Sequence, residues 1–268
     1  MTKRLGFAIL ALGLGVGVLW CNEHLEKLAL EEAFAEASLP KSETKLRLLP
    51  KSTMGQVIHH DSYSLSYSEE HEQAEWVAYE LRKDHLSDLD FKRPYFEIDS
   101  TVKTGAAHWR NYKNSGYDRG HLCPAGDRRY SLEAYYETFL TSNISPQDHY
   151  FNAGVWNRLE EQTRRWAKEY NSVFVVTGGV LTKNLKTIGE EHVSVPDYFY
   201  KVIFDDSNSE VKIIAFLIPA KESSEHLNNF VVSVDSLEHI TGIDFFPELE
   251  DNLENTLEAS EEYSDWEF

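Results

Sequence analysis

Three apolar segments in the second half of the chain constrain the fold most strongly. They are rich in Val, Ile, Phe and Tyr, and each is bounded by Gly, Pro, Asp or Asn, a composition typical of β-strands. The segments are "SVFVVTGGVL" (172–181), "DYFYKVIFD" (197–205) and "VKIIAFLIP" (211–219). Because short strands and loops outnumber helices, the sequence predicts an α+β domain with a central, largely antiparallel β-sheet flanked by helices.

The other elements are less sharply marked. The strongest helix is "FNAGVWNRLEEQTRRWAKEY" (151–170), in which Val155, Leu159 and Trp166 form a stripe that we expect to face the core. Further elements are expected in four places: a strand followed by a second strand or a helix at 59–81, a strand at 95–99, a short helix or turn and a strand ending at Pro146 within 131–147, and a strand and a helix stopped by Gly242 within 226–243.

The composition allows a proper core, since 41% of the 268 residues are hydrophobic and 13% are aromatic. The formal net charge is −19, but the charges are unevenly distributed. Residues 92–186 carry 14 Lys and Arg against 10 Asp and Glu, whereas residues 244–268 carry 10 acidic residues and no Lys or Arg. Because the local field matters more than total charge for an anionic ligand, the acidity does not exclude phosphate chemistry.

The N-terminus predicts a targeting segment. Lys3 and Arg4 precede an apolar run from Leu5 to Trp20, which is the layout of a signal peptide or of a short membrane anchor. Either alternative predicts an exported domain that is periplasmic, membrane-anchored or secreted, and a mitochondrial location is less favoured. We expect four segments along the chain: the targeting segment 1–21, a linker 22–55, a folded domain 56–247 and an acidic, solvated tail 248–268.

The chain has two cysteines, Cys21 and Cys123. Because Cys21 lies in the targeting segment, a disulfide framework within the domain is excluded. No CxxC or Cys/His spacing accompanies Cys123, so we expect a small, partly buried side chain rather than a nucleophile or a zinc ligand.

The stretch "SGYDRGHLCPAGD" (115–127) places Asp118, Arg119, Gly120 and His121 in succession. An imidazole with a pKa of about 6.5 accepts a proton near neutral pH, so His121 is a candidate for activating water. The planar guanidinium of Arg119 matches a phosphate, and Gly120 permits a backbone shape that directs both neighbours into one cleft. Any single histidine is more often structural, and the chain has 11.

The long helix supplies possible partners. At about 100° per residue, Asn152, Glu160 and Arg164 fall on one side of an ideal α-helix. The alternative interpretation is a solvated helix face with a Glu160–Arg164 ion pair. Such a pair stabilises a helix by only about 0.2–0.5 kcal/mol.

Taken together, the two segments carry a resemblance. "DRGHLCPAGD" (118–127), followed by "TSNISPQDHYFNAGVWNRLEEQTRR" (141–165), resembles the DNA/RNA non-specific endonuclease family. Both motifs occur in the expected order, and the similarity extends from about Trp76 to "GIDFFPEL" (242–249). The resemblance implies a ββα-metal (His-Me finger) active-site motif and an endonuclease domain at 56–247.

The resemblance also implies roles for individual residues. His121 is the expected general base, Asn152 is the expected direct ligand of Mg²⁺ (with Mn²⁺ as an alternative metal), and Glu160 is expected to hold the metal through water. Arg119 and Arg164 are expected to contact phosphate and to stabilise the transition state. Arg93 is expected to bind substrate. Asn143 and Gln147 match positions that are expected to be structural.

The predicted function is therefore a Mg²⁺-dependent, sugar-non-specific endonuclease with DNA and RNA as substrates. Two alternatives remain open: a non-catalytic nucleic-acid-binding relative, and a phosphodiesterase that acts on smaller nucleotides. A membrane is a partner only if the N-terminal segment is uncleaved, and a homodimer is one option for the oligomeric state. A further hypothesis is that the acidic tail folds over the basic stretch as an autoinhibitory mimic of DNA.

Overall fold

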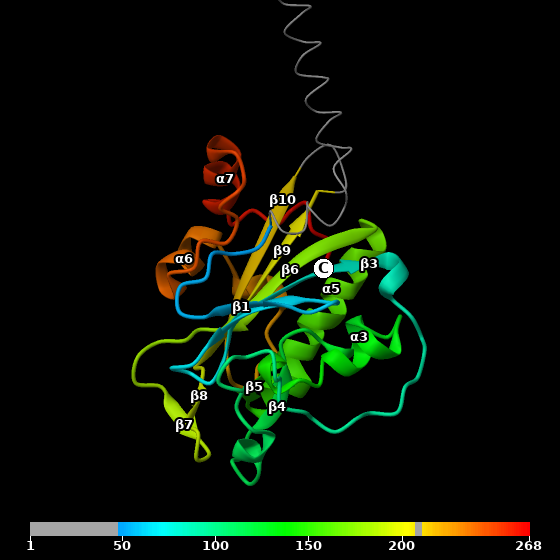
Figure 1. Ribbon diagram of the computed structural model, residues 1–268. Helices are drawn as coiled ribbons and strands as arrows, with labels where there is room; N and C mark the ends of the chain where they lie inside the picture. Colours follow the sequence, from blue (N-terminus) through cyan, green and yellow to red (C-terminus); the bar gives the residue numbers. More distant parts are fainter. Residues whose placement is uncertain (1–47, 207–210) are drawn as a thin grey trace, which may run out of the picture. The chain divides into compact units, whose positions relative to one another are not determined.

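The computed structural model describes residues 48–206 and 211–268, so the predicted targeting segment and most of the predicted linker lie outside the described residues. A seven-stranded sheet forms the centre of the described part (Figure 1). Every neighbouring pair in it is antiparallel. In spatial order its strands are β1 (Gln56–His59), β2 (Ser64–Ser68), β3 (Gln73–Arg82), β6 (Ser172–Gly179), β9 (Tyr198–Asp205), β10 (Lys212–Pro219) and β11 (Val231–Val232).

Two small antiparallel pairs lie outside this sheet: β4 (Asp118–His121) with β5 (Ile144–Gln147), and β7 (Lys186–Ile188) with β8 (Val193–Val195). The helices are α3 (Leu132–Glu137), α4 (His149–Phe151), α5 (Asn157–Glu169), α6 (Val234–Thr241) and α7 (Asp251–Glu258). None of the helices within the described ranges is long and apolar enough to cross a membrane. The predicted α+β class with a central antiparallel sheet is confirmed.

The inner strands β6, β9 and β10 are buried on both faces, which explains why they are apolar almost throughout. Successive residues of a strand point to opposite faces, so Val175 and Val176 of β6 enter different cores. Helix α5 covers the first core with Trp166, and α6 covers the second core with Leu237. Figure 1 shows α6 and α7 on one side of the sheet and α5 on the other.

The predicted long helix is interrupted. Residues Asn152–Trp156 form a π-helical segment, in which Gly154 has non-helical backbone angles (φ −101°, ψ −108°). The N–H of Asn157 donates to the carbonyl of Asn152, one residue further back than in an α-helix. The extra residue breaks the count of 100° per residue between Asn152 and Glu160, so our geometric argument for one shared helix side was wrong. Such π-segments are frequent at functional sites.

Two smaller expectations also changed. The segment 95–99 is not a strand, because only Glu97 forms an isolated bridge, with Leu140. Its residues Tyr95 and Ile98 are exposed, so the segment lacks the regular buried face of a strand in a sheet. In the region 59–81 both elements are strands, and β5 ends at Gln147 rather than at Pro146.

The predicted acidic tail is largely exposed, but its end is packed on the domain. Trp266 is only 3% exposed, and its ring packs edge-on against Trp166 of α5 with centroids 4.9 Å apart. The indole N–H of Trp166 donates to the carbonyl of Glu267 at 2.7 Å. The expectation rested on the density of acidic residues, most of which do stay exposed, but burial of one large aromatic ring anchors the segment to α5.

The last residues of the predicted linker are also packed. Ser52 and Thr53 donate their hydroxyl groups to the carboxylate of Glu75 at 3.0 and 2.6 Å, and Glu75 is 1% exposed on β3. Residues 48–55 therefore form part of the same body as the sheet.

Candidate active site

The motif Asp118–His121 forms β4, and its pairing with β5 fixes where each side chain lies. In the register of the two strands Gly120 faces Ser145 and His121 faces Ile144. A Cβ atom at Gly120 would lie 2.1 Å from the side chain of Gln147, so only glycine fits at this position. In Figure 1 the pair lies beside the start of the long helical region, which completes a ββα arrangement.

Asn143 fixes the turn that follows β4. Its carboxamide oxygen accepts the N–H of Cys123 at 2.8 Å, and its amide nitrogen donates to the carbonyls of Cys123 and Thr138 at 3.0 and 2.9 Å. Cys123 itself is fully buried, and burial raises the pKa of its thiol to about 12. A thiol that stays protonated is a poor nucleophile and metal ligand, so the expectation of a packing role for Cys123 is confirmed.

His121 packs against two aromatic rings that also contact each other. The centroids of Phe96 and Phe139 are 5.5 and 5.0 Å from the centroid of the imidazole. Its Nε2 is buried and has no hydrogen-bond partner within the described part of the chain. Burial, together with the positive charge of Arg93, lowers the pKa of His121 to about 3. The imidazole is therefore neutral near pH 7 and able to accept a proton.

Two arginines meet this aromatic group. The guanidinium of Arg93 lies 5.7 Å from the ring centroid of Phe96, and that of Arg119 lies 5.5 Å from the same ring and 5.6 Å from the ring of Trp109. Phe96 thus contacts two cations and the imidazole of His121. The Nε–H of Arg119 donates to the carbonyl of Trp109 at 3.4 Å, whereas its terminal nitrogens have no protein hydrogen bond among the described residues, so they can bind an anion.

Asn152 is attached to the same short strand through Asp118. Its amide nitrogen donates to Asp118 Oδ2 at 3.1 Å, and Nδ1 of His149 lies 2.9 Å from that oxygen. This bond orients the carboxamide, because its nitrogen end is committed to the strand. No hydrogen bond from a described residue engages the oxygen end, which is the end that binds a cation.

Glu160 lies among charges of both signs. Burial raises the pKa of its carboxyl, although the positive charges of Lys201 and Arg164 oppose the rise. Lys201, on β9, is fully buried, and burial lowers the pKa of its ammonium group. The ammonium lies 4.8 Å from the ring centroid of Trp156. Burial dominates at both groups because neither is compensated by a hydrogen-bonded ion pair within the described residues.

Arg164 pairs with the loop that follows the motif rather than with Glu160. Its Nη1 donates to Asp127 Oδ1 at 2.7 Å, and the hydroxyl of Tyr79 donates to Oδ2 at 3.1 Å. The Asp127 carboxylate is 1% exposed and the Arg164 side chain 23%. The alternative of a solvated Glu160–Arg164 pair is therefore wrong, because the guanidinium reaches a buried partner from another element.

Sequence reasoning missed several residues of this region, among them Phe96, Asp127 and Lys201. Two of these three had a signal. Asp127 ends the quoted motif, and Lys201 is the one charged residue inside the apolar segment "YFYKVIF" (198–204). Phe96 had no signal, because its position above β4 depends on a loop that no periodic pattern predicts.

With this geometry in view, comparison with known proteins identifies the family. The family model for DNA/RNA non-specific endonucleases matches residues 46–252. The chain belongs to this family. The match covers β4, β5 and the long helical region, so the predicted family resemblance is confirmed.

Similar proteins of this family come from animals and bacteria. The chain is 38% identical over 206 residues to the mitochondrial nuclease EXOG of Danio rerio, covering 70% of this chain and 60% of that protein. It is 32% identical to mitochondrial endonuclease G of Homo sapiens, covering 73% and 71%, and 30% identical to a nuclease of Nostoc sp., covering 82% of each. The chain therefore spans about 60% of the length of the EXOG relative.

A solved structure has the same fold. The crystal structure of the EndoG/EndoGI complex, described as showing the mechanism of EndoG inhibition, contains a chain that superposes with a TM-score of 0.72 at 28% identity. The alignment covers 81% of this chain and 96% of that one. The fold neighbour agrees with the α+β class and with a ββα nuclease motif.

Proposed function

We propose that this protein is a sugar-non-specific endonuclease that hydrolyses phosphodiester bonds of DNA and RNA with Mg²⁺, or alternatively Mn²⁺, as its metal. One observation carries the proposal. The short strand β4 presents a neutral His121 with an unpartnered ring nitrogen, and the same strand holds the carboxamide of Asn152 through Asp118.

His121 serves as the general base. It accepts a proton from the water that attacks phosphorus, and its lowered pKa keeps it in the accepting form across the physiological pH range. The adjoining rings of Phe96 and Phe139 pack against the imidazole, so it is oriented before substrate arrives.

The arginines supply positive charge to the phosphate. Arg93 and Arg119 lie beside the ring of Phe96, and their terminal N–H groups would serve the non-bridging oxygens, where charge builds in the transition state. Arg164 is committed in part to Asp127, so it contributes both to the site and to the stability of the motif loop. None of these groups reads a base, and cleavage should therefore depend little on sequence and should weaken as salt rises.

The donor set fits a hard divalent cation. Mg²⁺ favours oxygen ligands, takes few of them from protein and keeps several waters, and here the oxygen of Asn152 is the candidate direct ligand while Glu160 would hold a water. When bound, the metal compensates negative charge on the phosphate and lowers the pKa of its own water.

The test is digestion of supercoiled plasmid and of RNA by the full-length chain, with Mg²⁺ and Mn²⁺ titrated after treatment with EDTA. Metal-dependent cleavage of both polymers is the expected result. Binding of both polymers without cleavage at any metal concentration would favour the non-catalytic alternative. Hydrolysis of a small model phosphodiester with the polymers left intact would favour the nucleotide phosphodiesterase.

We also infer export of the domain, which rests on the apolar run Leu5–Trp20 of the sequence. Fractionation of the cells that express the full-length chain tests this, and an exclusively cytosolic protein would contradict it.

A further inference from the structure

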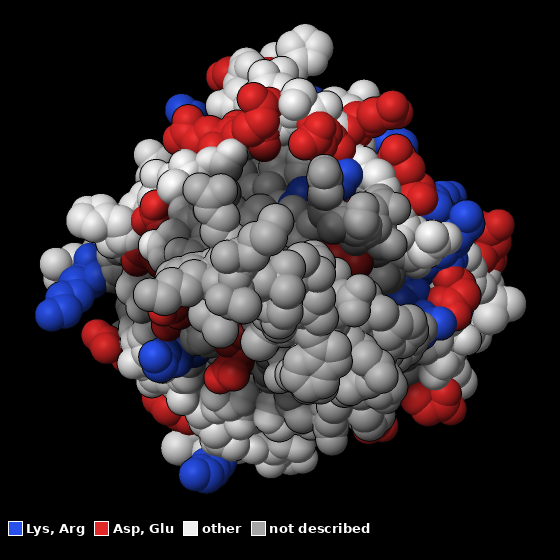
Figure 2. All heavy atoms as spheres, turned by 90° about the horizontal axis from the view of Figure 1, so that it is seen from above, with Lys and Arg blue, Asp and Glu red and all other residues white. Residues whose placement is uncertain are grey.

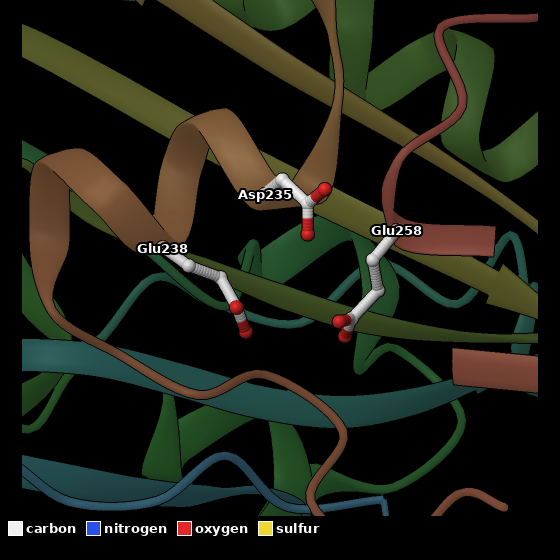
Figure 3. Close-up of side chains that lie close together, drawn as sticks. All are labelled: Asp235, Glu238 and Glu258. Carbon is white, nitrogen blue, oxygen red and sulfur yellow. The ribbon is translucent and has the colours of Figure 1, made fainter. Parts of the chain in front are cut away.

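Helices α6 and α7 bring three carboxylates together on the side of the sheet opposite to α5. Asp235 and Glu238 are three residues apart on α6, so they share one face of that helix. Glu258 is the last residue of α7. One oxygen from each lies within 4.8 Å of the others, and Figure 3 shows the carboxylates of Glu238 and Glu258 directed toward the space below Asp235.

Glu258 is the unusual member of this carboxylate cluster. The residue is only 5% exposed, and its Oε1 has no hydrogen-bond partner within the described part of the chain. Its side chain points toward the other two carboxylates in Figure 3. A buried carboxylate without a partner is strongly unfavourable unless it gains a proton or a cation.

The surroundings offer Glu258 little compensation. No Lys or Arg occurs between residues 222 and 268, and Asp244 and Glu254 add negative charge to that of Asp235 and Glu238. Lys51 reaches Asp244 at 3.5 Å rather than the cluster. Burial, reinforced by these carboxylates, raises the pKa of Glu258 to about 8. Figure 2, seen from above, shows Asp and Glu side chains grouped along the upper edge of the picture with few Lys and Arg side chains between them.

We propose that Asp235, Glu238 and Glu258 form a Ca²⁺ site that links α6 to α7 and is separate from the candidate active site. Carboxylate oxygens are the ligands that Ca²⁺ prefers, and opposite oxygens around it, at 2.3–2.6 Å from the ion, are roughly 4.6–5.2 Å apart. The oxygens of the cluster lie within 4.8 Å of one another, so a Ca²⁺ ion bridges them with little movement. Asp235 is exposed, which leaves the outer coordination positions to water.

The site has a structural consequence. Glu238 already accepts the N–H of Phe245 at 2.9 Å, which ties the end of α6 to the second core. A cation shared with Glu258 joins α7 to the same point. The chain after α7 continues to Trp266, which packs on α5, so the linked segment spans both faces of the sheet.

The experiment measures Ca²⁺ binding by isothermal titration calorimetry, and thermal unfolding in CaCl₂ or EDTA, with the full-length chain. All proteins carry Asn152→Ala, so that the candidate active-site metal does not contribute. Four are compared: this parent, Glu258→Gln, Asp235→Asn, and Glu261→Gln as a matched control. The control removes one exposed charge from the same acidic segment.

The parent and Glu261→Gln should bind one Ca²⁺ and gain a few degrees in Tm. Glu258→Gln and Asp235→Asn should bind at least tenfold more weakly and gain little. In EDTA, Glu258→Gln should unfold at a higher temperature than the parent, because it removes an uncompensated charge. Equal Ca²⁺ responses in all four proteins, or no binding by the parent at millimolar Ca²⁺, would overturn the proposal.

Discussion

Burial raises the pKa of both Glu160 on α5 and Glu258 on α7, yet their surroundings are opposite. Around Glu160 the chain supplies Lys201 and Arg164 as well as Asp127, so negative and positive charges come from three separate elements. Around Glu258 the neighbouring groups are Glu238, Glu254, Asp235 and Asp244, all of one sign. Positive charges thus offset part of the cost of burying Glu160, whereas Glu258 has neighbours of only its own sign and is left for an external cation.

The comparison teaches how this protein distributes charge. The segment that holds the motif carries more basic than acidic residues, and the C-terminal segment carries only acidic ones. A site for an anionic polymer needs fixed cations that are present before the substrate arrives, because rearranging them would cost free energy. A structural cation site needs the opposite, a fixed excess of carboxylates.

The largest expected effect is a loss of nuclease activity that involves the active-site region and not the C-terminal one. Changing His121→Ala removes the proposed general base and should lower the rate of plasmid and RNA cleavage by about 10²–10⁴-fold. The Ca²⁺ response of the C-terminal region should be unchanged. His59→Ala, an exposed histidine on β1, is the control. Undiminished cleavage by a folded His121→Ala protein would remove the basis of the proposed function.

The second test asks whether packing rather than charge anchors the C-terminal segment. Trp266→Ala should lower the free energy of unfolding by about 3–5 kcal/mol, because it removes a buried ring from contact with Trp166 and Tyr170. Urea unfolding followed by circular dichroism measures this. The half-exposed Phe268→Ala should cost clearly less. A negligible effect of Trp266→Ala would mean that the segment is dispensable after all.

A third change leaves a buried carboxylate in the active-site region without its ion-pair partner, which makes it more like Glu258 in the C-terminal region. Arg164→Met leaves the buried carboxylate of Asp127 without its cation and should destabilise the fold by about 3 kcal/mol, at the low end for a broken buried pair because Arg164 is partly exposed. Adding Asp127→Asn should restore part of the loss. Urea unfolding measures the free energies. If the losses of stability from Arg164→Met and Asp127→Asn simply add in the double variant, the two side chains do not interact.

The smallest effects are changes of stability with pH, and they have opposite signs in the two regions. Burial lowers the pKa of His85 to about 4 and that of His121 to about 3, against an ordinary 6.5. Between those values the unfolded chain binds more protons, so acidification from about pH 6.5 to 4 should lower stability. His85→Gln should reduce this loss. If stability changes with pH between 6.5 and 4 equally with and without His85, the lowered pKa assigned to His85 is contradicted.

Glu258 should act in the other direction. Its pKa is raised from 4.5 to about 8, so the folded state binds more protons between those values and stability should fall as pH rises through that window in EDTA. Glu258→Gln should remove this part of the slope, and Ca²⁺ should remove it as well. Glu261→Gln is the matched control, and an identical pH slope in Glu258→Gln would argue against an unpaired buried carboxylate.

Much of the fold followed from local patterns. The apolar segments 172–181, 197–205 and 211–219 predicted strands correctly, because residues that are buried on both faces must be apolar whatever their partners are. The stripe of Val155, Leu159 and Trp166 predicted the buried side of the helix, and all three are fully buried. Local signals failed where a single long-range contact decided the outcome, as for Trp266.

The sequence by itself determined which chemical groups are present and their order: the residues Asp118 to His121, the amide of Asn152, and the contrast between a basic middle and an acidic end. Only the tertiary structure decided which groups meet. The π-helical turn at Gly154 changes the direction of the helix, Asp127 rather than Glu160 takes Arg164, and Phe96 joins two arginines to His121. The physical reason is that charge pairing and ring stacking act through space over a few ångströms, whereas periodicity reports only the neighbours along one element.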